Sequence, residues 1–319
     1  MWAKLMWDPY CDADAVQKEF VWGYYKEAAP YIYDYLKLQQ GGLVSSGKNL
    51  WIYDSPVSHK DGFLNQAMIK EYSRLFDLAE KAVEGDSEIL DRVRLSRLTI
   101  QYSELEIART LTGQDVDEIR AKLELFRERT KYFNIRTLNE RNNNPQDYCD
   151  NYVERYLPRE VTNLAEGAQI EWIVAPSGGY GKNAEKIITD GLYGGTSFVE
   201  SWVGWEGIDG EFIMDLGEVK EIRSISSDYL HQLGQWVFLP KGVTYSVSED
   251  GESYVEFGRC QKAENRSNQV LFDDFTVAKE SPIKARYIKV VIESIKTCPS
   301  WHYGIGHNGW FFLDEITVQ

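Results

Sequence analysis

Hydrophobic and polar positions follow a helical period in the first half of the chain. Between residues 63 and 83, apolar side chains recur every three or four positions, as at Met68, Tyr72, Phe76 and Val83. This spacing predicts an amphipathic helix of about five turns. Residues 89–111 are apolar on more than one face, which predicts a helix at the centre of a bundle.

Capping residues and helix breakers delimit the other expected helices. Asp115, followed by Glu118, forms a capping box that opens a helix reaching Phe133. Asp12 or Asp14 caps a helix through Tyr25. Pro30 suits the first turn of another helix, which we expect to reach Leu38 and to end at Gly41 and Gly42. Residues 41–62 are expected to be irregular apart from one short strand at 49–53, and residues 146–156 predict a last short helix.

The second half has the short period of β-strands. The β-rich runs are residues 169–174, 211–216, 221–227, 243–248, 254–258, 287–292 and 310–318. Asp250-Gly251 between two of these runs is a strong hairpin signal. Regular short strands over roughly 150 residues indicate a β-sandwich or jelly roll. The expected fold is therefore α + β in two domains: an α-helical bundle over residues 1–160 and an antiparallel β-sandwich over 161–319.

Composition supports this division and narrows the function classes. Of the 25 glycines in 319 residues, 7 precede residue 161 and 18 follow it. The net charge of −15 disfavours nucleic acid and anionic membrane surfaces as partners, because both select clustered Lys and Arg. No apolar run is long enough for membrane insertion, and no secretion signal is visible at the start.

The cysteines and acidic residues give no catalytic or zinc-binding constellation. Cys11, Cys149, Cys260 and Cys298 have no metal-ligand spacing. A Cys260–Cys298 bridge and four free, buried thiols both stay open. Glu104 and Glu106 lie two residues apart, so on a helix they face different directions, and we expect both to be solvated.

Seven segments of the second half, in order, resemble the discoidin fold, also called the coagulation factor V/VIII C-type domain (F5/8 type C). They begin at Asn163-Leu164-Ala165, Ile188-Thr189-Asp190-Gly191 and Trp202-Val203-Gly204-Trp205. They continue through Phe212–Gly217, Val243–Gly251 and Ala285–Lys289 to Trp310–Val318. In bacterial polysaccharide-degrading proteins this fold appears as family-32 carbohydrate-binding modules. The resemblance implies a galactose-binding-like sandwich whose partner is a glycan.

The fold implies a ligand site in the loops at one end of the sandwich. The segment from Cys298 to Gly309 offers Trp301 and Tyr303 as stacking platforms, and His302, His307 and Asn308 as partners for hydroxyl groups. Tyr180 lies in a glycine-rich loop that is expected to face the same site. The alternative is that Trp301 and Tyr303 bind no ligand and only close the end of the sandwich. We expect four other tryptophans in the core: Trp202, Trp205, Trp236 and Trp310.

The resemblance also implies a structural Ca²⁺ ion near the start of the sandwich. The matching ligands are Asp190, Thr196 and Glu315, with main-chain oxygens of Ile187 and Tyr193. Calcium prefers six to eight oxygen ligands, which a carbonyl-rich turn with two carboxylates supplies. The long spacing between Asp190 and Thr196 departs from the family pattern. An ordinary Asp-Gly turn beside an exposed glutamate is the alternative.

The first half resembles the helical segment that follows the barrel of certain large bacterial glycoside hydrolases. Lys4–Pro9, Tyr24-Tyr25 and Ala28-Ala29-Pro30 carry this likeness. It implies action outside the cytoplasm, extracellular or periplasmic. We expect a non-catalytic carbohydrate-binding protein or accessory region of a glycan-degrading enzyme. The alternatives are an accessory half whose catalytic barrel lies in another domain or chain, and a purely structural interaction module.

Overall fold

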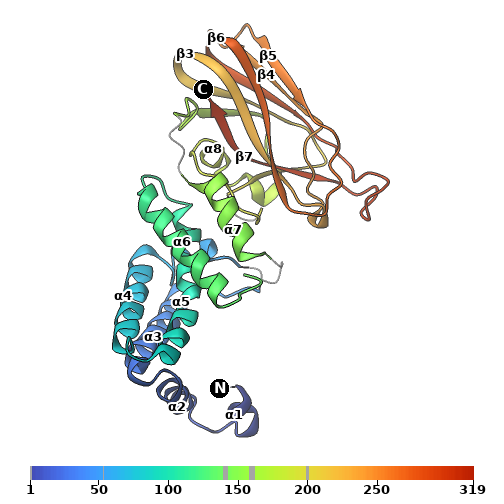
Figure 1. Cartoon of the computed structure of the whole chain (residues 1–319). Coiled ribbons are helices and arrows are strands. Elements are labelled where there is room, and N and C mark those ends of the chain that lie inside the picture. Colours follow the sequence, from blue (N-terminus) through green and yellow to red (C-terminus); the bar gives the residue numbers. More distant parts are fainter. Residues whose placement is uncertain (1, 53, 139–142, 158–161, 199–200) are drawn as a thin grey trace. The chain divides into compact units, whose positions relative to one another are not determined.

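The computed structural model describes residues 2–52, 54–138, 143–157, 162–198 and 201–319. The chain divides into two compact units, Met1–Pro158 and Arg159–Gln319. Helices make up the first unit and strands dominate the second, as the periodicity predicts (Figure 1).

The first unit is a bundle of helices with short connecting turns. Its elements are α1 (Trp2–Trp7), α2 (Ala13–Tyr25), η1 (Lys26–Ala28), α3 (Ala29–Ser46), η2 (Pro56–His59), α4 (Gln66–Ala82), α5 (Ser87–Ala108), α6 (Val116–Tyr132), α7 (Pro145–Asn151) and the π-helical turn η3 (Tyr152–Tyr156). The predicted caps are confirmed, since the side chains of Asp12 and Asp115 accept hydrogen bonds from first-turn N–H groups.

Helix α5 lies at the centre of the helical unit. It contributes Val93 and Ile100 to one buried cluster with α2, α3 and α4, and Leu98 and Leu105 to a second cluster with α6 and α7. Burial on several faces explains why its sequence shows no clear apolar stripe. The prediction of a central helix is confirmed.

The structure corrects two predictions around α3. The helix does not end at Gly41 and Gly42 but continues to Ser46 and ends at Gly47, which has φ 64°. A Cβ on Gly42 would lie 3.1 Å from Phe63 Cβ, so this glycine allows close packing inside the helix and does not break it. Residues 49–52 are an irregular segment and a turn, not a strand, and Tyr53 of that prediction lies outside the described residues.

The second unit is an antiparallel β-sandwich. Its elements are β1 (Gln169–Val174), η4 (Gly178–Gly181), α8 (Ala184–Ile187), β2 (Val203–Glu206), β3 (Gly210–His231), η5 (Leu233–Gln235), β4 (Gly242–Ser248), β5 (Val255–Gln261), β6 (Leu271–Glu293) and β7 (Trp310–Val318). The strand order is β2-β7-β3-β6-β4-β5, with β1 paired to β3. The β4–β5 hairpin turns at Asp250-Gly251 as predicted.

Strands β3 and β6 run through both layers of the sandwich. The first part of β3 pairs with β1 and its last part with β7, while the last part of β6 pairs with β4. The β3–β6 register shifts between Asp215 and Lys220, beside Gly217 with φ 83°, where the strand bends. The two strands predicted at 211–216 and 221–227 are therefore one bent strand.

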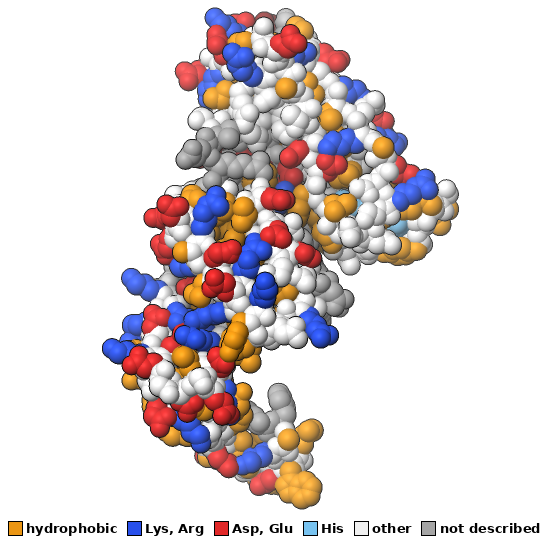
Figure 2. All heavy atoms as spheres, viewed as in Figure 1, with side chains coloured by type: hydrophobic (Ala, Val, Ile, Leu, Met, Phe, Trp, Pro, Cys, Tyr) orange, Lys and Arg blue, Asp and Glu red, His pale blue; other side chains and the backbone are white. Residues whose placement is uncertain are grey.

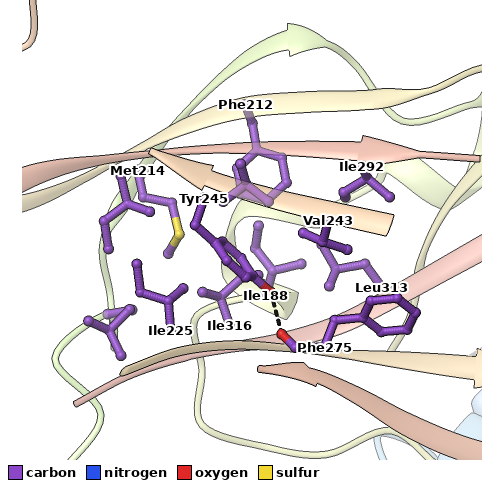
Figure 3. Close-up of a cluster of buried hydrophobic side chains, with 14 of the residues drawn as sticks. Ile188, Phe212, Met214, Ile225, Val243, Tyr245, Phe275, Ile292, Leu313 and Ile316 are labelled. Atoms are coloured by element: carbon purple, nitrogen blue, oxygen red, sulfur yellow. Dashed lines mark hydrogen bonds between the residues drawn. The ribbon is translucent and has the colours of Figure 1, made fainter. Parts of the chain in front are cut away.

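The core lies between these layers (Figure 3). Side chains from all the longer strands meet in it, among them Phe212, Ile225, Val243 and Leu313. Tyr245 is fully buried, and its hydroxyl donates a hydrogen bond to the carbonyl of Phe275 at 2.5 Å. This bond joins β4 to β6 across the core and satisfies the hydroxyl.

Asn163 joins the first segment of the sandwich to its last strand. Its side-chain oxygen accepts from the N–H groups of Ala165 and Val318, and its amide donates to the carbonyl of Ile316. All four cysteines are free, so no disulfide joins Cys260 to Cys298; Cys149 and Cys298 are buried, whereas Cys11 and Cys260 are partly exposed. Among the described helices, none has the length and apolarity to cross a bilayer.

Candidate functional site

Three connections gather at the end of the sandwich where β3 ends and β7 begins. These are residues 232–241, 262–270 and 294–309. The last connection is a closed loop, because Thr297 pairs with Asn308 and the N–H of Cys298 donates to the carbonyl of His307 at 2.8 Å. We call residues 296–309 the apical loop. It contains most of the predicted glycan-binding residues.

His302 fixes the apical loop from inside. It is buried, its Nε2 donates to the carbonyl of Leu233 at 3.0 Å, and its Nδ1 accepts from the N–H of Gly304 at 3.1 Å. Both ring nitrogens are therefore used within the protein. His302 holds the loop against η5 and offers no free nitrogen to a ligand in this conformation.

An exposed aromatic cluster lies on the other side of the loop. Tyr303 is 70% exposed and its hydroxyl donates to the carbonyl of Gly234. The rings of Tyr303 and His307 lie 6.2 and 5.1 Å from the half-buried ring of Trp236. We call Trp236, Tyr303 and His307 the aromatic platform. Asn308, also exposed, follows it directly and packs against Gly207.

The backbone of Trp236 has φ 63°, a conformation that bulky residues rarely adopt. Such strain persists only where the surroundings enforce it, and it is frequent at binding sites. The sequence pattern predicts Trp236 in the core and does not mark it as a candidate site residue. Its position directly after Gly234-Gln235, outside any strand, is the signal that could have marked it as a candidate.

Trp301 belongs to a neighbouring group with charged partners. Its Nε1 donates to Glu264 at 2.8 Å, and the guanidinium of Arg266 lies 5.0 Å from the ring centroid. Glu264 and Arg266 form an ion pair, and the hydrogen bond from Arg266 lowers the pKa of Glu264. Trp301 is thus half-buried, with Arg266 stacked over its ring.

Tyr180 is packed into a third aromatic group. Its ring lies 5.2 Å from Trp310 and 5.0 Å from Phe312, and burial raises the pKa of its hydroxyl. Of the tryptophans expected in the core, Trp202 and Trp205 are buried, whereas Trp236 and Trp310 are only partly so. The structure therefore brings Tyr303 and His307 together around Trp236, with Asn308 next in the chain, and leaves Tyr180 in a different cluster.

Carboxylates gather at the predicted calcium position. Glu315 is not exposed, as the alternative required, but buried. Asn163 donates to its Oε1 at 2.8 Å, whereas its Oε2 has no hydrogen-bond partner among the described residues. Burial, with the charges of Asp314 and Asp190 nearby, raises the pKa of Glu315 to about 10.

The other residues of the predicted calcium site lie in the 187–196 segment and in β7. The buried Asp314, which the sequence prediction did not include, accepts from the N–H of Gly194, and Asp190 accepts from the N–H of Leu192. The hydroxyl of Tyr193 contacts Thr317, and Ile187 and Thr196 are half-buried. The described residues contain no group of three or more His, Cys, Asp or Glu side chains arranged as a metal centre, so carbonyl oxygens would have to complete the ligand set.

The helical unit corrects the expectation that Glu104 and Glu106 are solvated. Glu106 is buried and accepts two hydrogen bonds from Arg109, at 2.8 and 3.1 Å, and one from Tyr148 at 2.9 Å. Glu104 is half-buried and accepts from Ser73. Burial is possible because Arg109, one turn along α5, neutralises Glu106. Both carboxylates have structural partners.

Comparison with known proteins gives similarity of structure only. No protein-family model and no curated protein matches the sequence. Similar solved structures include the family-32 carbohydrate-binding module of C. perfringens NanJ in complex with galactose (16% identity, TM-score 0.33; 49% of this chain and 97% of that one). The C-terminal domain of a Bacteroides fragilis chitobiase is also similar (20%, TM-score 0.31; 50% and 97%). A third is SpGH29 (16%, TM-score 0.32), where 55% of this chain matches 30% of that one, so this chain spans less than a third of that protein.

Proposed function

We propose that the β-sandwich unit binds a glycan on the aromatic platform of its apical loop. The observation that carries this proposal is the exposed group of Trp236, Tyr303 and His307. The C–H face of a pyranose packs on aromatic rings, and its hydroxyls need directional partners, which His307 and Asn308 supply. Trp301, with Glu264 and Arg266, forms the adjoining edge of the site.

We further propose that the chain is a non-catalytic accessory region for glycan degradation. A site with one or two exposed rings buries little area, so its affinity is expected to be weak. Attachment to a catalytic domain raises the effective concentration of such a site at its substrate.

Isothermal titration of the full chain against galactose-, N-acetylglucosamine- and mucin-type glycans tests the proposed site. We expect weak binding to at least one glycan, and a loss of about tenfold or more in Trp236→Ala and Tyr303→Ala. Tyr132→Ala is the matched control, because Tyr132 on α6 is also 70% exposed. Absence of binding to every glycan, or binding that both platform variants keep, would contradict the proposal and favour a structural role.

For calcium, we propose that Asp190 and Glu315 contribute carboxylate oxygens to a structural ion, with Thr196 and the main-chain oxygens of Ile187 and Tyr193. The support is the partnerless Oε2 of buried Glu315. A divalent cation would stabilise the ionised form of these carboxyls and make the segment rigid. Added Ca²⁺ should raise the melting temperature of the sandwich, and Glu315→Gln should abolish that rise.

A second candidate function concerns the helical unit, where hydrophobic side chains gather over the end that carries α1 (Figure 2). The exposed large hydrophobic residues of α1, α2 and the turn between them are Met6, Trp7, Tyr10, Phe20 and Trp22, with Trp7 and Tyr10 more than 90% exposed. Such a patch is typical of a protein interface. We propose that it docks on a catalytic barrel domain or chain. Co-sedimentation with glycoside hydrolases encoded beside the gene, lost in Trp7→Ser, tests this.

A further inference from the structure

A groove in the helical unit lies between α2, α3 and the turn that follows α3. Its volume is about 610 Å³, which is within the range of small-ligand sites. Helix α2 contributes Asp14 and Gln17 to its lining, and α3 contributes Gln40 and Leu43; Leu50 and Phe63 complete it. The groove thus combines an apolar floor with polar side chains along its sides.

The charges that line the groove neutralise each other. Asp14 accepts hydrogen bonds from Lys37 at 2.9 Å and from the hydroxyl of Tyr33 at 2.7 Å, and it pairs with Lys18 at 3.0 Å. These contacts, with Lys37 first, hold the pKa of Asp14 well below its usual range. The groove therefore offers fixed hydrogen-bonding groups without a free cation among its described lining residues, and so does not favour an anionic ligand.

The amide groups of the groove suit a ligand rich in hydroxyls. Gln17 and Gln40 each present a donor and an acceptor, as a sugar hydroxyl does, so the two are complementary. Leu43, Leu50 and Phe63 supply the apolar surface against which the C–H face of a pyranose packs. An apolar peptide helix would desolvate the amide groups of Gln17 and Gln40 without giving them partners, which is unfavourable.

A tryptophan directly follows one of the lining residues in the sequence. Trp51 follows the lining residue Leu50 and is 71% exposed. The backbone of Trp51 is anchored, because Asp54 accepts from its N–H at 2.9 Å and contacts Nε2 of the buried His59 at 2.9 Å. The exposed indole is available for stacking.

We propose that this groove is a second carbohydrate site, which takes a neutral oligosaccharide with Trp51 as its stacking residue and Gln17 and Gln40 as its hydroxyl partners. It is independent of the aromatic platform on the sandwich. Two separate sites would let one chain hold a glycan at two points, which increases avidity without any new contact at either site.

The test uses the full chain in a Trp236→Ala, Tyr303→Ala background, so that the aromatic platform does not contribute. Saturation-transfer NMR with neutral gluco-, galacto-, xylo- and N-acetylglucosamine oligosaccharides reports binding at the groove. We expect a signal with at least one of them, and an affinity loss of about tenfold in Trp51→Ala and in Gln40→Ala.

Tyr132→Ala and Gln66→Ala, which change exposed residues outside the groove lining, are the matched controls and should keep the signal. Binding that survives Trp51→Ala and Gln40→Ala would overturn the proposal, as would the absence of any signal in the platform-deficient background. Binding of an apolar dye that Trp51→Ala abolishes, with no sugar bound, would also overturn it and indicate a protein partner. Because the platform residues are already changed, these outcomes do not depend on the sandwich site.

Discussion

Gly304 lies directly against the indole of Trp236: a Cβ at this glycine would stand 2.9 Å from Cε2 of the ring. This contact lets the apical loop pass beneath Trp236 while Tyr303 and His307 flank the ring. The geometry of the aromatic platform therefore depends on a residue that has no side chain.

Gly304→Ala should displace Trp236 and weaken glycan binding about tenfold or more, with a loss of about 1–3 kcal/mol in unfolding free energy from overpacking. Titration calorimetry and urea denaturation measure the two effects. Gly234→Ala is the control in the adjacent turn, because its added methyl group would meet no atom within 4 Å. Equal binding by the Gly304→Ala variant and the unchanged chain would contradict the platform's role.

The buried hydroxyl of Tyr245 should contribute measurably to stability. It donates to the carbonyl of Phe275 and also contacts the hydroxyl of Ser227, both at 2.5 Å. Tyr245→Phe leaves these buried groups with fewer partners, so we expect unfolding free energy to fall by about 1–2 kcal/mol. Tyr303→Phe removes an exposed hydroxyl and should change the unfolding free energy by less than about 0.5 kcal/mol. Urea denaturation measures both variants.

The ion pair of Asp215 and Arg286 should stabilise the sandwich near neutral pH, and this contribution should be lost in acid. Arg286 Nε and Nη2 lie 2.7 and 2.8 Å from the two oxygens of Asp215, and this hydrogen bonding lowers the pKa of Asp215 below its usual 3.8. The carboxyl of Asp215 therefore binds a proton more tightly in the unfolded chain than in the folded one. The contribution of the ion pair to unfolding free energy is present above about pH 4 and is lost as the pH falls through the lowered pKa.

Since both side chains are partly exposed, we expect a contribution of about 0.5–1 kcal/mol. Melting temperatures between about pH 2 and 7 measure it, and Asp215→Asn should flatten the lower part of the profile. Glu128→Gln, at an exposed position of α6, serves as the control. A profile for Asp215→Asn that falls as steeply as the unchanged chain would refute the assignment.

The buried pair of Glu106 and Arg109 should be critical for the helical unit. Arg109→Met removes the guanidinium that neutralises the buried carboxylate of Glu106 and leaves it the hydrogen bond from Tyr148, so we expect a loss of about 3–5 kcal/mol in unfolding free energy. Arg74→Met breaks the exposed pair with Glu71 at the same spacing on α4 and should destabilise the unit far less, because solvent screens this pair. Circular dichroism during urea unfolding measures both, and similar losses would argue against the importance of burial.

Local sequence patterns predict the helices and most strands, because periodicity and caps act over a few residues. Strands β1 and β7 match their predicted ranges, and the Asp12 and Asp115 caps act as expected. Of β6, only residues 287–292 are predicted as a strand, and the preceding part from residue 271 to 286 is not. It contains Asp273, Asp274, Lys279 and Glu280 and is held by pairing with β3, which lies far away in sequence.

The candidate site is less predictable from the sequence, because it too depends on residues that are far apart in the chain. The residues of the apical loop are visible in the sequence, but their roles depend on distant partners. His302 is occupied by the carbonyl of Leu233, and Trp236 is held half-exposed over Gly304. Neither relationship leaves a local pattern, so sequence reasoning assigned His302 to the ligand and Trp236 to the core.

The bonds from Asn163 to Ile316 and Val318 have a consequence for engineering and for evolution. They place the two extremities of the sandwich beside each other. A fold with adjoining extremities can be inserted into a surface turn of a host protein, or circularly permuted, without stretching either layer. The sandwich is thus suited to transfer into other proteins as an intact domain, with the structure of its apical loop unchanged.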